Sequence, residues 1–138
     1  MATKRYLLDS SAWLAHLFGE PGVEEVTALL VQSDVEVAIS ALSLFEVYGR
    51  LAAIAREQEW TNLWSTYGLL FAAVIPADEK VVQRAIGLRQ ATPERLPTVD
   101  ALIAATASLH GLVLVHRDPH LSRIPKRELS QVVLPVKG

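Results

Sequence analysis

Short apolar runs alternate with longer segments in which apolar residues recur every three or four positions. The short runs predict buried strands, and the longer segments predict helices with one apolar face. The expected strands are Arg5–Leu8, Val35–Ile39, Ala73–Ile75, Leu112–Val115 and Gln131–Leu134. The expected helices are Ser11–Phe18, Val23–Gln32, a long helix from Ser40 or Ser43 to about Glu57, a helix carrying Trp60, Trp64, Tyr67 and Phe71, one from Asp78 through Arg89, and Thr98–His110. Because strands separated by helices form βαβ units, we predict a single α/β domain over residues 1–138, with a parallel central sheet and helices on both faces.

Composition is typical of a folded domain and excludes several classes of protein. The 138 residues are 51% hydrophobic and 20% charged, which excludes intrinsic disorder. No apolar run approaches the ~20 residues of a membrane span, and the N-terminus lacks the pattern of a signal peptide. The absence of cysteine removes disulfides and thiolate zinc sites. We therefore expect a cytoplasmic protein with no membrane partner.

Charge is distributed unevenly along the chain. Residues 1–79 carry 4 basic and 11 acidic side chains, whereas residues 80–138 carry 9 basic and 4 acidic ones. The basic second half offers counter-charge to a partner that bears phosphates. An ordinary solvated surface explains the same asymmetry.

Carboxylates stand next to the most apolar segments of the sequence. Asp9 ends the first expected strand, Asp118 closely follows the strand Leu112–Val115, and Asp100 lies in the first turn of a helix. Ligands of open α/β sheets bind beyond the carboxyl ends of the strands, where Asp9 and Asp118 are candidates to meet. Glu46 is a fourth candidate. Converging carboxylates repel one another and need a cation, and oxygen ligands without cysteine favour Mg²⁺ or Mn²⁺.

Each acid also has a structural interpretation. Asp9 and Asp100 fit as acids at helix N-termini, and Asp118 before Pro119 fits as the start of a turn. Glu46 fits as the partner of Arg50, four residues on, within a polar stripe on the solvent face. The stripe consists of Ser43, Glu46, Arg50, Ala53 and Glu57.

Other catalytic patterns are absent from the sequence. His116 and His120 are four residues apart, but Pro119 lies between them and no Glu follows His116, which excludes the helical metalloprotease motif. The sequence contains no nucleophile elbow, Walker loop or dinucleotide-binding glycine pattern. Metal-dependent hydrolysis of phosphodiesters, with no protein nucleophile, fits best.

Three blocks of residues resemble the PIN-domain ribonucleases, and most of all the VapC toxins of bacterial and archaeal toxin–antitoxin pairs. The blocks are Leu7–Ala12, Glu46 in its helix, and Leu96–Ala107 followed by His110–Gly111 and Arg117–Asp118. The resemblance implies a parallel sheet flanked by helices and an endoribonuclease dependent on Mg²⁺ or Mn²⁺. It assigns the acidic quartet to Asp9, Glu46, Asp100 and Asp118, with Ser10 or Ser11 as the supporting hydroxyl. It also implies a homodimer and an inhibitory VapB-like antitoxin.

The resemblance leaves the exact activity open. The family implies an RNA substrate of the tRNA or ribosomal stem-loop class, and Arg117, Arg123, Lys126 and Arg127 would hold its phosphates. A solvated basic segment explains the same four side chains. A non-cleaving module that binds RNA or protein and a nuclease for structured DNA are the alternative functions. An assay on RNA and DNA, with and without Mg²⁺, separates the three.

The apolar residues of two expected helices lead to an expectation about partners. The aromatic face of Trp60, Trp64, Tyr67 and Phe71, together with Leu44, Tyr48 and Leu51, exceeds what one sheet face needs, so we predict a homodimer and a groove for an antitoxin helix. The alternative is that these residues belong to the core.

His116 stands where relatives carry Ser or Thr. Residues 116 and 118 point to the same side of an extended chain, so we expect the imidazole to donate a hydrogen bond to the Asp118 carboxylate. The neighbouring acids should raise its pKa. The alternative is a solvent-exposed edge histidine.

Overall fold

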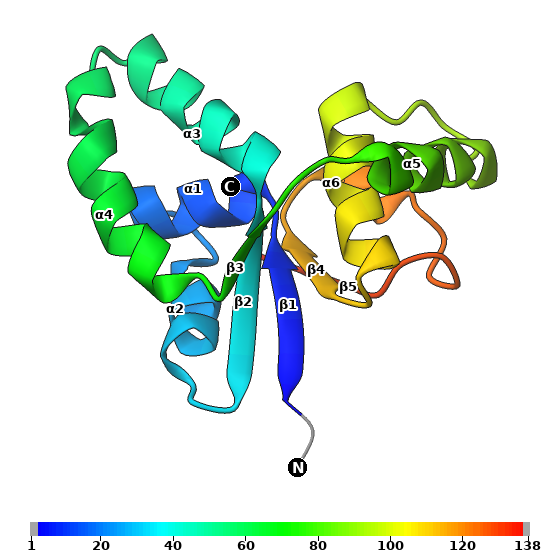
Figure 1. Ribbon diagram of the computed structural model, residues 1–138, viewed down its shortest axis with the longest axis horizontal. Coiled ribbons are helices and arrows are strands. Elements are labelled where there is room, and N and C mark those ends of the chain that lie inside the picture. Colours follow the sequence, from blue (N-terminus) through cyan, green and yellow to red (C-terminus); the bar gives the residue numbers. More distant parts are fainter. Residues whose placement is uncertain (1–2, 137–138) are drawn as a thin grey trace.

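A parallel five-stranded sheet forms the centre of the protein, with strand order β3-β2-β1-β4-β5 (Figure 1). The computed structural model describes residues 3–136, so the two residues at each end of the predicted domain lie outside the described part. The strands are β1 (Lys4–Leu8), β2 (Val35–Ser40), β3 (Ala73–Ile75), β4 (Val113–His116) and β5 (Gln131–Val133). The helices are α1 (Ser10–Phe18), α2 (Val23–Val31), α3 (Ala41–Ala53), α4 (Trp60–Leu70), α5 (Glu79–Ala91), α6 (Thr98–Leu109) and α7 (Pro119–Ser122), with a 3₁₀ turn at Glu57–Glu59.

Helices cover both faces of the sheet, as the sequence predicts. Leu7 on β1 packs into a cluster with apolar residues of α5 and α6, whereas its neighbour Leu8 packs into a second cluster with residues of α1, α2, α3 and α4. This alternation follows from the strand geometry, which directs successive side chains to opposite faces. Within the described residues no helix is long and apolar enough to cross a membrane.

The aromatic face of α4 turns inwards onto Trp13. The Trp13 side chain is fully buried, and its ring centroid lies 5.2–6.2 Å from those of Trp60, Trp64, Tyr67 and Phe71. Such contacts stabilise a core beyond their buried area. The core interpretation is therefore confirmed for Tyr67 and Phe71, whereas Trp60 and Trp64 are half-buried and pack against the same core cluster.

Two local features depart from the expectations. The helix expected to reach about Glu57 ends at Ala53, because Ala55 adopts a left-handed conformation with φ 58°. No glycine or proline marks that end in the sequence. The turn expected after Asp118 is instead the start of the short helix α7, whose N-cap is Asp118 itself. Gly111 has the predicted left-handed conformation, with φ 65°.

Candidate active site

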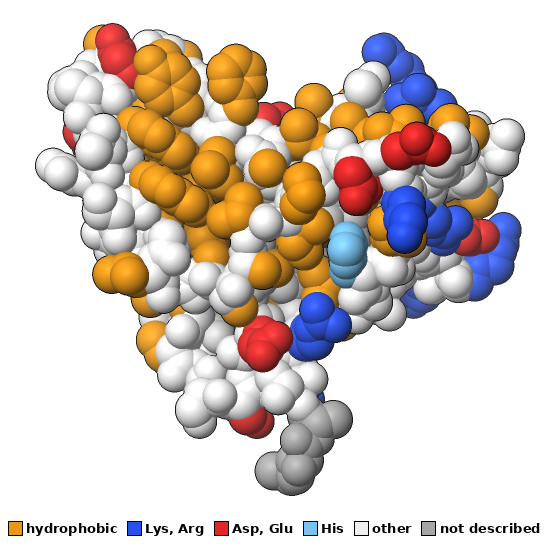
Figure 2. Space-filling view, in the orientation of Figure 1, with side chains coloured by type: hydrophobic (Ala, Val, Ile, Leu, Met, Phe, Trp, Pro, Cys, Tyr) orange, Lys and Arg blue, Asp and Glu red, His pale blue; other side chains and the backbone are white. Residues whose placement is uncertain are grey.

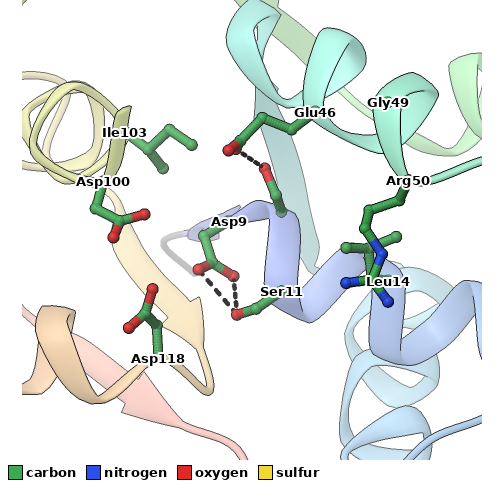
Figure 3. A pocket seen from close by; sticks show the side chains of 10 residues that line it. Asp9, Ser11, Leu14, Glu46, Gly49, Arg50, Asp100, Ile103 and Asp118 are labelled. Carbon is green, nitrogen blue, oxygen red and sulfur yellow. Dashed lines mark hydrogen bonds between the residues drawn. The ribbon is translucent and has the colours of Figure 1, made fainter. Parts of the chain in front are cut away.

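Four segments meet beyond the carboxyl ends of the central strands. They are the β1–α1 junction, α3 after β2, the first turn of α6, and the loop from β4 to α7. A cavity of about 380 Å³ opens there. Its lining includes Asp9, Glu46, Asp100 and Asp118, whose carboxylates point toward a common space (Figure 3). The structure thus brings together the four acids that the sequence predicts.

Asp9 sits at the end of β1 and is nearly fully buried. Its carboxylate accepts hydrogen bonds from the Ala12 N–H (2.8 Å) and from the Ser11 hydroxyl (2.7 Å), so it is also the N-cap of α1. Burial raises the pKa of Asp9 to about 7, although the two hydrogen bonds oppose the shift; the nearby charges of Asp118 and Asp100 add to it. Asp9 is therefore both the N-cap of α1 and a cavity acid whose neutral form is favoured by burial.

Asp100 and Asp118 face each other across the cavity. Burial raises the pKa of Asp100 to about 6, and the charges of Asp118 and Glu46 contribute to the increase. Asp118 also caps α7, because its Oδ1 accepts the His120 N–H at 2.9 Å. Acids whose neutral forms are favoured by their surroundings gain most from a bound cation.

Glu46 is held over the cavity by hydroxyl groups. The Ser10 hydroxyl donates to its carboxylate and lies 3.0 Å from the Ser43 hydroxyl. Ser43 is fully buried, so the solvent-facing stripe expected on this helix is wrong at its N-terminal end. Among residues 3–136 no ion pair joins Glu46 to Arg50, and the expected pairing of the two side chains is also wrong.

Ser10 and Ser11, the two serines after Asp9, have different hydrogen-bond partners. Ser10 contacts Glu46, whereas Ser11 bonds the Asp9 carboxylate and accepts the backbone N–H of Arg117 at 3.1 Å. Ser11 therefore ties the start of α1 to the loop that carries Asp118. The sequence alone does not predict these different contacts for two adjacent serines.

His116 lies elsewhere than expected. Its side chain is fully buried, its Nδ1 accepts the Asp118 backbone N–H (3.0 Å), and its Nε2 donates to Gln131 Oε1 (2.7 Å). The predicted bond to the Asp118 carboxylate and the exposed alternative are both wrong, because the chain leaves the strand direction after His116 to cap α7. Burial lowers the pKa of His116, contrary to the predicted increase.

The four basic residues predicted to bind RNA lie outside the lining of the acidic cavity. Arg117 is ion-paired with Glu20, and Arg123 lies 2.7 Å from Glu94. Lys126 and Arg127 are exposed. Their role in RNA binding stays a prediction.

Two residues that the sequence did not place in the site now belong to it. Arg50 lines the cavity on the side of Leu14, away from Asp100 and Asp118 (Figure 3). One ring nitrogen of His120 lies within 4.8 Å of carboxylate oxygens of both Asp100 and Asp118. Helical spacing from Glu46 could have indicated Arg50, whereas His120 depends on the unpredicted helix α7.

Comparison with known proteins identifies the family of this chain. The family model described as the PIN domain matches residues 6–127. The chain belongs to the PIN-domain family. A sequence comparison with curated proteins finds no match.

Solved structures of several other proteins have the same fold. VapBC2 from Rickettsia felis, bound to promoter DNA, matches with a TM-score of 0.76 at 18% identity over 94% of this chain and 98% of that chain. A toxin–antitoxin complex from Klebsiella pneumoniae matches with a TM-score of 0.66 at 29% identity over 93% and 96%. FitAcB from Neisseria gonorrhoeae matches with a TM-score of 0.71 at 23% identity over 91% and 95%.

Proposed function

We propose that this PIN domain is a divalent-metal-dependent endoribonuclease and the toxin of a VapBC-type pair. The observation that carries the proposal is the convergence of four carboxylates on one cavity, two of them with raised pKa values. The solved toxin–antitoxin complexes of the same fold support the biological role.

The donor set fits a hard cation. Asp9, Asp100 and Asp118, with Glu46, offer carboxylate oxygens and no sulfur, which suits Mg²⁺ or Mn²⁺. A bound cation would supply the charge that acidifies water and stabilises the negative charge developing on a phosphodiester. Its positive charge would also favour the ionised form of Asp100, whose pKa is raised by burial and by the neighbouring carboxylates.

The chain's own residues prepare the cavity for this chemistry. The Ser11 hydroxyl and the Ala12 N–H orient the Asp9 carboxylate, and the Ser10 hydroxyl orients Glu46. His116 fixes the backbone of Asp118 through its Nδ1. With a pKa of about 7, Asp9 holds a proton on its carboxylate in a large share of the metal-free molecules at neutral pH, and a bound cation would favour the ionised form. No side chain is required as a nucleophile.

A partner would cover the apolar surface that remains on α3 and α4. Figure 2 shows hydrophobic side chains gathered over the region between these helices. Tyr48 on α3 is 39% exposed and packs edge-on against the half-buried Trp60 of α4, with ring centroids 6.2 Å apart, and exposed apolar side chains gathered in one region indicate an interaction surface. We assign this surface to a VapB-like antitoxin helix, and a homodimer remains part of the proposal.

RNA cleavage tests the proposal. Purified protein should cut single-stranded or stem-loop RNA when Mg²⁺ or Mn²⁺ is present, stop when the metal is chelated, and leave DNA of the same sequence intact. Binding without cleavage would favour the non-cleaving module. Cleavage of structured DNA in place of RNA would favour the third hypothesis.

A further inference from the structure

His120 provides a nitrogen atom at the edge of the carboxylate cluster. A ring nitrogen of His120 and one oxygen each from Asp100 and Asp118 lie within 4.8 Å of one another, close enough to share one ion. The Nδ1 atom of His120 is 3.0 Å from Asp118 Oδ1. This histidine stands outside the acidic quartet.

Capping of α7 does not account for the imidazole. Asp118 Oδ1 already accepts the His120 backbone N–H at 2.9 Å, and that bond is independent of the side chain at position 120. The His120 side chain is 47% exposed, so the core does not hold its ring in place. A separate hydrogen bond between its Nδ1 and Asp118 Oδ1 places the ring beside the two carboxylates.

Ligand chemistry gives an imidazole in this position a role. Mg²⁺ prefers oxygen ligands and coordinates nitrogen reluctantly, whereas Mn²⁺ and the later first-row ions accept imidazole. A cavity with carboxylates alone discriminates weakly between Mg²⁺ and Mn²⁺. Adding one imidazole to two carboxylates favours Mn²⁺.

We propose that His120 is a nitrogen ligand of the divalent cation and gives this site its preference for Mn²⁺ over Mg²⁺. The proposal rests on the proposed function in one respect, namely that the cavity binds a divalent ion. It concerns a residue of this chain, because the PIN-domain resemblance rests on the acids and assigns no role to position 120.

Calorimetric titration of the intact protein with Mn²⁺ and with Mg²⁺ tests the assignment. His120→Ala should weaken Mn²⁺ binding about tenfold and change Mg²⁺ binding by less than about twofold. His110→Ala is the matched control, because His110 is exposed and follows the opposite end of α6 from Asp100. The control should bind both ions as the unmodified protein does.

Pulsed electron paramagnetic resonance gives a second readout that does not depend on activity. The Mn²⁺ complex should show nitrogen hyperfine modulation, and His120→Ala should lose it. Equal weakening for both ions, or unchanged Mn²⁺ binding in His120→Ala, would overturn the nitrogen-ligand assignment and leave the nuclease proposal standing. Failure of the unmodified protein to bind either ion would overturn both.

Discussion

Asp118→Asn is expected to lower metal-dependent RNA cleavage by about 10²–10³-fold, since each metal-bound charge contributes several kcal/mol to transition-state stabilisation. The fold should survive, because the asparagine Oδ1 can still accept the His120 N–H that begins α7. Asp100→Asn should behave alike, because Asp100 lies in the same cluster. Cleavage rates at saturating metal, with circular dichroism to verify folding, measure the effect.

Glu46→Gln is the most informative member of this series. The glutamine can keep the hydrogen bond from Ser10, so the substitution removes charge with little change in shape. Glu57→Gln, an exposed acid in the turn after α3, is the matched control and should cleave normally. Normal cleavage by Glu46→Gln would remove Glu46 from the site, and normal cleavage by Asp118→Asn would contradict the proposed mechanism.

Asp9→Asn is expected to stabilise the metal-free protein by about 2–4 kcal/mol at pH 8 and by much less at pH 5. Burial raises the pKa of Asp9 from 3.8 to about 7 in the folded state. Between these pH values the unfolded chain releases the Asp9 proton and the folded protein retains it. The stability that protonated Asp9 contributes below about pH 4 is therefore lost as the pH rises through 7.

Asparagine avoids this loss and can still accept the Ala12 N–H as the cap of α1. Denaturant unfolding in a chelating buffer at pH 5 and pH 8 measures the difference. Asp34→Asn, at an exposed aspartate before β2, is the control and should shift the stability little at either pH. If Asp9→Asn changes the free energy of unfolding equally at the two pH values, the buried Asp9 charge is not what lowers the stability at high pH.

The sequence predicts the fold well where local signals and burial agree. All five strands occur, and Asp9, Asp78 and Gly111 lie at the helix boundaries that their chemistry favours. The end of α3 was not predictable, because an alanine adopts the left-handed conformation that usually indicates glycine. Helix α7 has four residues, too few to show a helical period.

The candidate site was likewise predictable only where local sequence signals place a residue. Asp9, Asp100 and Asp118 could be placed together because each stands at a strand end or in a first helical turn. The hydrogen bond of His116 Nε2 could not be predicted, because its partner Gln131 is brought near from β5 by the tertiary structure. The rotation of α3 that turns Glu46 toward Ser10 also depends on packing between distant segments.

Anomalous diffraction from crystals grown with Mn²⁺ tests the central claim most directly. The account predicts an anomalous peak in the cavity, within coordination distance of carboxylate oxygens from Asp9, Asp100 and Asp118. Asp100→Asn crystals should show a weaker peak at the same position. A well-ordered cavity without any peak at saturating Mn²⁺ would contradict the account.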